Sequence, residues 1–135
     1  MITYTTSTEG VETEQLAGFF VGWPTPPAPV THLRLLKNSD HVVLAKDEAS
    51  GQVVGFITAI TDHVLFAYIP LLEVLPDYKG RGIGQELARR MLTELDGIYS
   101  VDLLCDEDVQ PFYDRTGMFR AVGMTAKNFA AQSGK

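Results

Sequence analysis

The stretch "DYKGRGIG", Asp77 to Gly84, combines three glycines with the cations Lys79 and Arg81. Glycine has no Cβ, so an anion can approach the backbone N–H groups closely. If a helix begins directly after this stretch, its first N–H groups lack intrahelical acceptors and carry a partial positive charge, which suits phosphate. The two cations add charged donors. The sequence therefore predicts an anion site whose expected ligand is a phosphate group.

Two familiar phosphate loops do not fit this stretch. It lacks the Gly-Lys-Ser/Thr ending of a nucleoside-triphosphate loop. It also follows strands that we expect to be antiparallel, whereas a dinucleotide fingerprint opens a parallel βαβ unit. A glycine-rich turn that only connects a strand to a helix is the alternative interpretation of these residues taken alone.

A second stretch, "PFYDRTGM" at residues 111–118, offers a proton donor. A phenol has a reference pKa near ~10, so Tyr113 stays protonated at neutral pH and can donate. Cys105 ends an apolar run and has no neighbouring His or basic residue, so we interpret it as a packed side chain rather than a nucleophile. One cysteine and three scattered histidines show no metal-ligand spacing, and we expect no metal.

The first 40 residues are expected to hold one strand and two helices that precede these motifs. β-Branched residues alternate at residues 2–6, which is typical of a strand. Apolar residues recur at spacings of three and four over residues 11–23, which predicts a helix that the following prolines end. Thr31 is the expected N-cap of a second helix, which runs to residue 38.

The rest of the chain alternates strands and helices around the two motifs. We expect three consecutive antiparallel strands, a helix that begins in the glycine-rich turn, a parallel strand, a short helix capped by Asp108, and a last strand. These elements are predicted at residues 41–47, 52–60, 63–75, 84–97, 99–106, 109–116 and 119–126. The order βααβββαβαβ predicts a mixed α/β fold, with helices on both faces of one sheet.

Length and composition limit the class of protein. A chain of 135 residues that is 45% hydrophobic fits one domain, residues 1–135, and the last residues, 129–135, are expected to fray. A net charge of −6 argues against a nucleic-acid partner, which needs a clustered basic surface. Because no apolar run spans a membrane and no leader is recognisable, we expect no membrane partner and a cytoplasmic protein.

The segment "LLEVLPDYKGRGIGQEL", residues 71–87, resembles the acetyl-coenzyme A signature of the GNAT (GCN5-related N-acetyltransferase) superfamily. That signature is a strand ending in Val-x-Pro, then Arg/Gln-x-x-Gly-x-Gly/Ala, then a helix. "PFYDRTGM" resembles the family's Phe-Tyr-x-x-x-Gly-Phe segment, and "GQVVGF" its hairpin into the third strand. The resemblance covers residues 41–118; before them only the order of elements matches.

The resemblance implies a GNAT-like fold and an N-acetyltransferase that uses acetyl-CoA as cosubstrate. The acetyl group would pass by direct attack, in a ternary complex, to a primary amine on a small molecule or a protein. Homodimers are common in the family, so the resemblance also allows a homodimer.

The family's site residues carry over to matching positions of this chain. The backbone of residues 72–74 would bind pantetheine, N–H groups of residues 80–85 would bind the pyrophosphate, Arg81 and Arg115 would supply charge, and Tyr113 would protonate the departing thiolate. The implied cofactor-binding residues are Leu72, Glu73, Val74, Lys79, Gly80, Arg81, Gly82, Ile83, Gly84, Gln85, Phe112 and Arg115, and the implied catalytic residue is Tyr113.

Several positions depart from the family pattern. Lys79 replaces the usual Arg or Gln, and Met118 replaces a Phe. Asp106 stands where an Asn often touches the cofactor, and an ionised carboxylate cannot donate a hydrogen bond. The positions that hold a general base in relatives are Tyr68 and Pro70 here, so the base is either Glu73 or a water-mediated acceptor.

Two other functions stay open at this point. A non-catalytic acyl-CoA binding module would share every cofactor feature, and a phosphate-binding interaction domain would bind another nucleotide instead. Tyr113 argues against the first, and the Val-x-Pro strand against the second. In the region expected to bind the acceptor, His32 is interpreted as an exposed helix residue. Trp23 and the prolines after it form either a lid or a rigid connector.

Overall fold

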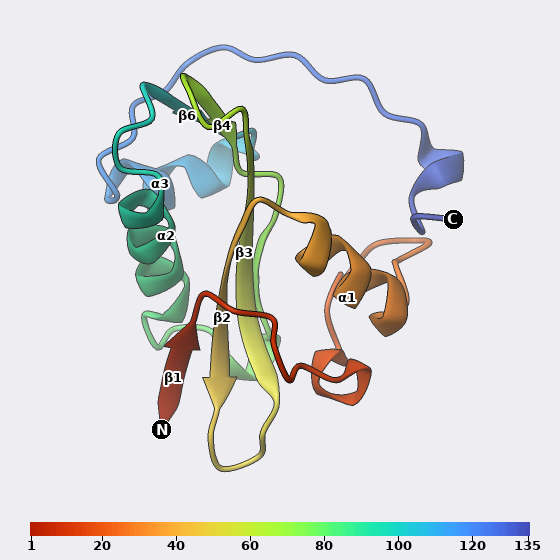
Figure 1. Cartoon of the computed structure of the whole chain (residues 1–135). Helices are drawn as coiled ribbons and strands as arrows, with labels where there is room; N and C mark the ends of the chain where they lie inside the picture. The colour runs from red at the N-terminus through yellow and green to blue at the C-terminus, as the bar shows by residue number, and fades with distance from the viewer.

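A six-stranded sheet forms the centre of the molecule in the computed structural model, which describes residues 1–135 (Figure 1). The strand order is β1-β2-β3-β4-β6, and β5 also pairs with β3. Every pairing is antiparallel except that of β4 with β6, which is parallel as predicted. The strands are β1 (Ile2–Thr5), β2 (His41–Asp47), β3 (Val53–Thr61), β4 (Phe66–Tyr68), β5 (Leu72–Val74) and β6 (Ser100–Asp102).

Three α-helices accompany the sheet: α1 (Pro29–Asn38), α2 (Ile83–Glu94) and α3 (Gln110–Asp114). Single turns of 3-10 helix occur at Thr13–Leu16, Pro76–Tyr78, Glu107–Val109 and Phe129–Ala131. α1 covers one face of the sheet and α2 covers the other (Figure 1). The predicted mixed α/β fold with helices on both faces is confirmed. None of the helices is both long and apolar enough to cross a membrane.

The alternation of strand residues divides the core into two layers. On β3, Ile57 packs in the layer under α2, whereas Phe56 packs in the layer under α1. The predicted face of α2 is confirmed, because its apolar residues at four-residue spacing, Ile83, Leu87 and Met91, are all buried. Burial of these side chains holds the start of α2, and with it the glycine-rich turn, against the sheet.

The helix predicted over residues 11–23 is wrong, and only Thr13–Leu16 forms a helical turn. Gly18 and Gly22 have φ angles of 94° and 84°, and Phe20 also has a positive φ of 63°. Left-handed residues interrupt a right-handed helix, so this segment forms a folded loop. The apolar spacing still has a structural role, because Leu16, Phe19 and Phe20 are buried under α1.

Three other element boundaries differ from the predicted ones. α1 begins at Pro29, which suits the first turn of a helix, so Thr31 lies inside the helix and does not cap it. The strand predicted at 63–75 divides into β4 and β5 at Pro70, which has no N–H to donate. Asp108 does not cap α3; it lies within the preceding 3-10 turn.

The last predicted strand, 119–126, is absent from the structure. We call residues 118–128 the arm; its residues 118–124 lie beside Tyr68 and residues 101–105, and the chain then passes over to the region of α1 (Figure 1). Residues 129–135, which we expected to fray, contact the region of α1. Gln132 Oε1 accepts the Thr25 N–H at 2.8 Å, and Arg34 Nη2 donates to the Gly134 carbonyl at 3.0 Å.

Candidate active site

The two parallel strands β4 and β6, at one edge of the sheet, diverge beyond Ile69. The Ile69 N–H donates to the Asp102 carbonyl at 2.9 Å, and no backbone hydrogen bond joins the two segments beyond that point. β5 then pairs only with β3, and residues 103–105 pair with no strand. Because alternate residues of a strand direct their N–H and C=O groups to opposite edges, β5 keeps unpaired backbone groups along the divergence.

A cavity of about 540 Å³ occupies the space between β5, the start of α2 and α3. Its walls include nearly all of the residues that the sequence implied for cofactor binding, together with Tyr113. It is lined by Leu72, Glu73, Val74, Tyr78, Lys79, Gly80, Gly82, Ile83, Gly84, Gln85, Val109, Phe112, Tyr113 and Arg115. Tyr78 and Val109 were not predicted from the sequence; they line the cavity because the 3-10 turns before α2 and α3 reach it.

Arg81 is the implied cofactor-binding residue that does not line this cavity. Its guanidinium lies 4.8 Å from the centre of the Tyr78 ring and donates to the Asp77 carbonyl at 3.1 Å. Lys79 and Arg115 are the cations at the cavity wall. The side chain of Arg81 therefore stiffens the turn, while the other two cations face the cavity.

Glycines shape the mouth of the cavity in two different ways. Gly80 and Gly82 have φ angles of 78° and 80°, and a Cβ on either would meet open space, so the left-handed backbone itself requires glycine there. A Cβ on Gly84 would lie 3.2 Å from the ring of Phe112. Gly84 therefore allows α2 and α3 to pack closely at this point.

The N-terminus of α2 is open toward the cavity. Its N-cap is Gly82, and no side chain caps the helix. The N–H groups of Ile83, Gly84 and Gln85 are among the first in the helix, where no preceding turn offers acceptors. Together with the partial positive charge of the helix end, they form a cradle whose chemistry suits a pyrophosphate.

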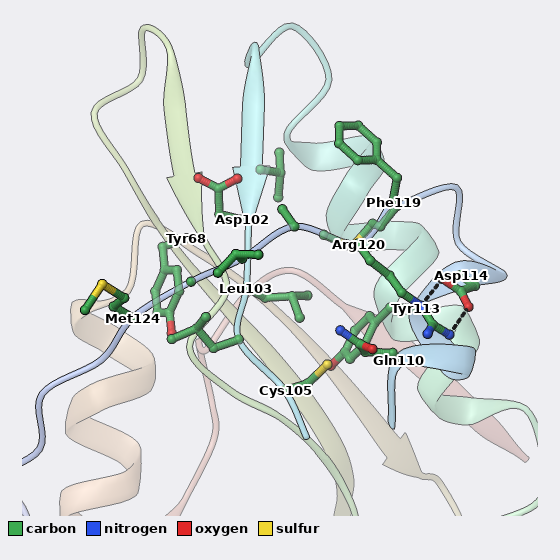
Figure 2. A pocket seen from close by; sticks show the side chains of 16 residues that line it. Tyr68, Asp102, Leu103, Cys105, Gln110, Tyr113, Asp114, Phe119, Arg120 and Met124 are labelled. Atoms are coloured by element: carbon green, nitrogen blue, oxygen red, sulfur yellow. Dashed lines mark hydrogen bonds and ion pairs between the residues drawn. The ribbon is translucent and has the colours of Figure 1, made fainter. Parts of the chain in front are cut away.

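Tyr113 lies on α3, between the first cavity and a second one of about 500 Å³. Figure 2 shows this second cavity, with Tyr68 and Met124 on one side and Tyr113, Gln110 and Cys105 on the other. Burial, and secondarily the charge of Cys105, raises the pKa of Tyr113 to about 12. The phenol is therefore protonated throughout the neutral range and can act as a proton donor.

Glu73 lines the first cavity, but its carboxylate hydrogen-bonds the loop that contains Phe20 and Val21, on the other face of the sheet. Glu73 Oε1 accepts the N–H of Phe20 at 2.9 Å, and Oε2 accepts the N–H of Val21 at 3.3 Å. Strand alternation directs this side chain toward the α1 face. The carboxylate holds the left-handed residue Phe20 in place, which gives Glu73 a positioning role that the sequence did not reveal.

Of the other candidate residues, Asp106 lies outside the two cavities, and Cys105 is not activated as a nucleophile. Asp106 lines neither cavity and precedes the 3-10 turn before α3. Burial, and then the charge of Asp106, raises the pKa of the Cys105 thiol, so the thiolate is disfavoured. No group of three or more His, Cys, Asp or Glu residues is arranged to hold a metal ion.

The prediction that His32 is exposed is wrong. Its side chain is only 1% exposed, and its ring lies 4.4 Å from that of Phe56 and 4.9 Å from that of Phe20. Neither ring nitrogen has a hydrogen-bond partner. Burial lowers the pKa of His32 to about 4, so the neutral imidazole is the stable form. His32 belongs to the core under α1.

A third cavity, of about 410 Å³, opens on the α1 face of the sheet beside the bend at Pro70. Its wall includes Trp23, Arg34, Thr58 and Gln132. The hydroxyl of Thr58 is buried and has no hydrogen-bond partner. This cavity lies next to the divergence of the strands, on the face opposite α2.

The chain matches known acetyltransferases. Residues 8–118 match the family model for the acetyltransferase (GNAT) family. The chain is 30% identical over 113 residues to an uncharacterized N-acetyltransferase, ycf52, of Pyropia yezoensis, covering 81% of this chain and 64% of that protein. It is 42% identical over 72 residues to GCN5-related N-acetyltransferase 3, chloroplastic, of Arabidopsis thaliana, covering 51% of this chain and 30% of that protein.

Two solved structures extend the similarity to the whole fold. A protein of Deinococcus radiodurans R1 assigned as an acetyltransferase is 48% identical, with a TM-score of 0.95 over 98% of this chain and 92% of that one. A GNAT-family acetyltransferase of Streptococcus pneumoniae is 28% identical, with a TM-score of 0.76 over 95% of this chain and 98% of that one. The chain belongs to the GNAT family of acetyltransferases.

Proposed function

We propose that this acetyltransferase transfers the acetyl group of acetyl-CoA to a primary amine by direct attack within a ternary complex. The observation that carries the proposal is the single cavity that brings together the unpaired edge of β5, the open N-terminus of α2 and the Tyr113 phenol. Acetyl-CoA supplies a thioester, whose carbonyl carbon an amine can attack once the amine is neutral.

The cofactor-binding role of the cavity follows from its donors. The backbone of residues 72–74 would hydrogen-bond the amides of pantetheine, much as a neighbouring strand would. The N–H groups of residues 83–85 would bind the pyrophosphate, with Lys79 and Arg115 adding charge at the wall. These residues hold the thioester at the divergence of the strands, so positioning would supply much of the rate.

Two groups act on the reacting atoms in this proposal. A backbone N–H near Val74 would polarise the thioester carbonyl and stabilise the negative charge that develops on its oxygen. Tyr113 would give its proton to the sulfur as the carbon–sulfur bond breaks, and its raised pKa keeps that proton available at neutral pH.

The acceptor amine would enter from the α1 face, through the cavity beside Pro70. Trp23 lines this cavity, and the backbone of Leu71 and Pro70 connects it to the strand divergence. Because the Glu73 carboxylate already accepts two N–H groups, we propose that water, rather than Glu73, takes the proton of the amine.

The test follows release of the CoA thiol spectroscopically across a panel of amines, amino acids and peptides. We expect release to depend on the amine, and Tyr113→Phe to lower kcat by about 100-fold while the KM for acetyl-CoA stays unchanged. Tyr99→Phe is the matched control, because Tyr99 is exposed and lines none of the cavities described. Amine-dependent release that is equally fast in Tyr113→Phe would contradict the role of Tyr113.

A further inference from the structure

The cavity on the α1 face beside Pro70 has a single charged residue in its wall, and that residue is a cation. Arg34 reaches the cavity from α1, and no Asp or Glu lines it. The whole chain, by contrast, has a net charge of −6. A cation without a carboxylate beside it attracts an anionic group and repels a cationic one. The cavity therefore favours a ligand that carries a negative charge.

The guanidinium of Arg34 has donors available for such a group. Its Nη2 donates to the Gly134 carbonyl at 3.0 Å, and Arg34 forms no ion pair with any carboxylate of the chain. A guanidinium has five N–H donors in one plane, and two of them can bind both oxygens of a carboxylate. One cation balances the single charge of a carboxylate, whereas a phosphate carries up to about two charges. Arg34 is therefore suited to a carboxylate.

A second polar group without a partner lies deeper in the same cavity. Thr58 is buried and lines the cavity, and its hydroxyl has no hydrogen-bond partner. Strand alternation places Thr58 on the same face of β3 as Phe56, which packs under α1. A buried hydroxyl without a partner destabilises the folded protein, and a polar group of a ligand would satisfy it.

The two polar groups lie at different depths. The Thr58 N–H donates to the Leu71 carbonyl at 3.1 Å, and Leu71 directly precedes β5. The Thr58 hydroxyl is therefore on the side of the strand divergence, where the proposed mechanism holds the thioester. Arg34 is exposed and contacts the segment near the C-terminus through Gly134. An acceptor with its amine at Thr58 would place a carboxylate toward Arg34.

Much of the remaining wall is apolar and comes from several segments. The rings of Phe20 and Trp23 lie 4.9 Å apart, and Ile60, Pro70 and Leu71 also line the cavity. Residues 131–134 contribute to the wall as well. A volume of about 410 Å³ lies within the range of small-molecule sites. A small acceptor would be contacted on several sides here, and an apolar side chain would lose its contact with water.

We propose that the acceptor is an amino acid with an apolar side chain, whose carboxylate Arg34 binds and whose amine contacts the Thr58 hydroxyl. This inference rests on the proposed acetyl transfer and names its acceptor. The amine nitrogen forms a bond to the acetyl carbon and loses a proton to water, and the carbon–sulfur bond breaks. The sulfur takes a proton from Tyr113, which water reprotonates. The products are an N-acetyl amino acid and the free CoA thiol.

The first measurement compares L-leucine and L-phenylalanine with their carboxamides, by release of the CoA thiol. Arg34→Gln should lower kcat/KM about 10- to 100-fold for the amino acids, because a charge-assisted contact is lost, and should leave kcat/KM for the carboxamides unchanged. Each substrate is compared between the wild type and the variant, so the different basicities of the amines cancel. Lys37→Gln is the matched control, because it removes the same charge from α1 at an exposed position outside the cavity.

A second measurement tests the hydroxyl. Thr58→Val should raise the KM about 3- to 10-fold for an amino acid and for its carboxamide alike, because the hydroxyl contacts the amine that both share. Thr58→Ser keeps a hydroxyl and should keep the KM of the wild type. The thermal midpoint of Thr58→Val should not fall, because the hydroxyl has no partner in its own chain. A lower midpoint, or an unchanged KM, would overturn the role of Thr58.

The outcomes separate this inference from the proposed function. Carboxamides, putrescine or a lysine in a peptide with blocked ends that react as fast as the amino acids would overturn the inference and leave acetyl transfer intact. An equal loss for amino acids and carboxamides in Arg34→Gln would also overturn it. If acetyl-CoA binds and no amine of the panel releases the thiol, the proposed acetyl transfer is overturned together with the inference.

Discussion

The two proposed halves of the site are built on different principles. The proposed cofactor half comprises residues 72–115, and residues 18–38 and the segment after 117 contribute the proposed acceptor half. The cofactor half depends on backbone groups: an unpaired strand edge, a helix N-terminus and glycines with positive φ. The acceptor half depends on side chains that meet from distant parts of the chain, such as Glu73 with Phe20 and Arg34 with Gly134. Backbone chemistry suits a cosubstrate shared by a whole family, whereas side-chain chemistry leaves the acceptor free to vary.

The largest effect is expected in the cofactor half, at Gly84. Gly84→Leu places a side chain where a Cβ alone would already lie 3.2 Å from the Phe112 ring. Overpacking of this kind costs about 1–3 kcal/mol, and it would push α3 and Tyr113 away from α2. We expect acetyl-CoA affinity to fall about 10- to 100-fold, measured by titration calorimetry.

Gly97→Ala is the matched control for this substitution. Gly97 lies beyond the other end of α2 and has a φ of 95°, so alanine strains the backbone there without approaching the cavity. The control should lower the thermal midpoint and leave acetyl-CoA affinity unchanged. If Gly84→Leu bound acetyl-CoA as tightly as the wild type, the contact between α2 and α3 would not shape the cofactor site.

The second effect belongs to the acceptor half and concerns stability. The pKa of His32 is lowered from 6.5 to about 4 by burial alone, so the unfolded chain binds more protons between these pH values. Stability from this residue is complete above pH 6.5 and is lost as the pH falls toward 4. For one such group, the free energy of unfolding should be about 2 kcal/mol lower at pH 5 than at pH 7.

Denaturant titrations of His32→Leu at both pH values check this linkage. Leucine has no titrating group, so the variant should lose the part of the pH dependence that His32 supplies. His41→Gln, at the first residue of β2, is the control and should keep the pH dependence of stability that His32 supplies. An unchanged slope of stability against pH in His32→Leu would show that the neutral, buried imidazole is not its source.

The smallest effect is expected at Glu73, which joins the two halves. Glu73→Gln keeps the shape and can still accept an N–H, but it loses the charge that strengthens both hydrogen bonds to the 20–21 backbone. We expect the KM for the amine to rise about 3- to 10-fold, with the KM for acetyl-CoA and the pH profile of kcat unchanged. Glu94→Gln, at the end of α2, serves as the control.

A different result at Glu73 would redefine its role. If Glu73 were the general base, Glu73→Gln would lower kcat by at least ~100-fold and remove the acidic limb of its pH profile. Steady-state rates against pH, with the amine and acetyl-CoA each varied in turn, separate the two outcomes.

The same contrast explains how far the sequence could predict the structure. The helix from Ile83 and its buried face follow from local spacing. The glycines before it predict positive φ angles, because glycine is the residue that adopts them without strain. Residues 17–23 were predicted as part of a helix because their apolar residues recur at helical spacing. A folded loop can bury apolar residues at the same spacing, so the spacing did not distinguish the two structures. Its shape depends on the tether from Glu73, which is distant in sequence.

The position of Tyr113 could be predicted from its motif, whereas the surroundings of His32 could not. His32 was interpreted as exposed because histidine is common on protein surfaces, whereas α1 packs its ring against Phe20 and Phe56, which are distant in sequence. The prediction of a last strand at residues 119–126 was wrong for another reason. Residues 119–126 have the composition of a strand, but a strand also needs a partner, and the chain itself supplies none.

Mapping of the acetyl-CoA site by NMR, with backbone amide shifts followed during a titration, tests whether the cavity at the start of α2 binds the cosubstrate. We expect the largest saturable shifts at residues 80–85 and 72–74, with the amides of Ile83, Gly84 and Gln85 foremost because their N–H groups would bind the pyrophosphate. Saturable binding whose largest shifts lie elsewhere, or no shift at the start of α2, would contradict it.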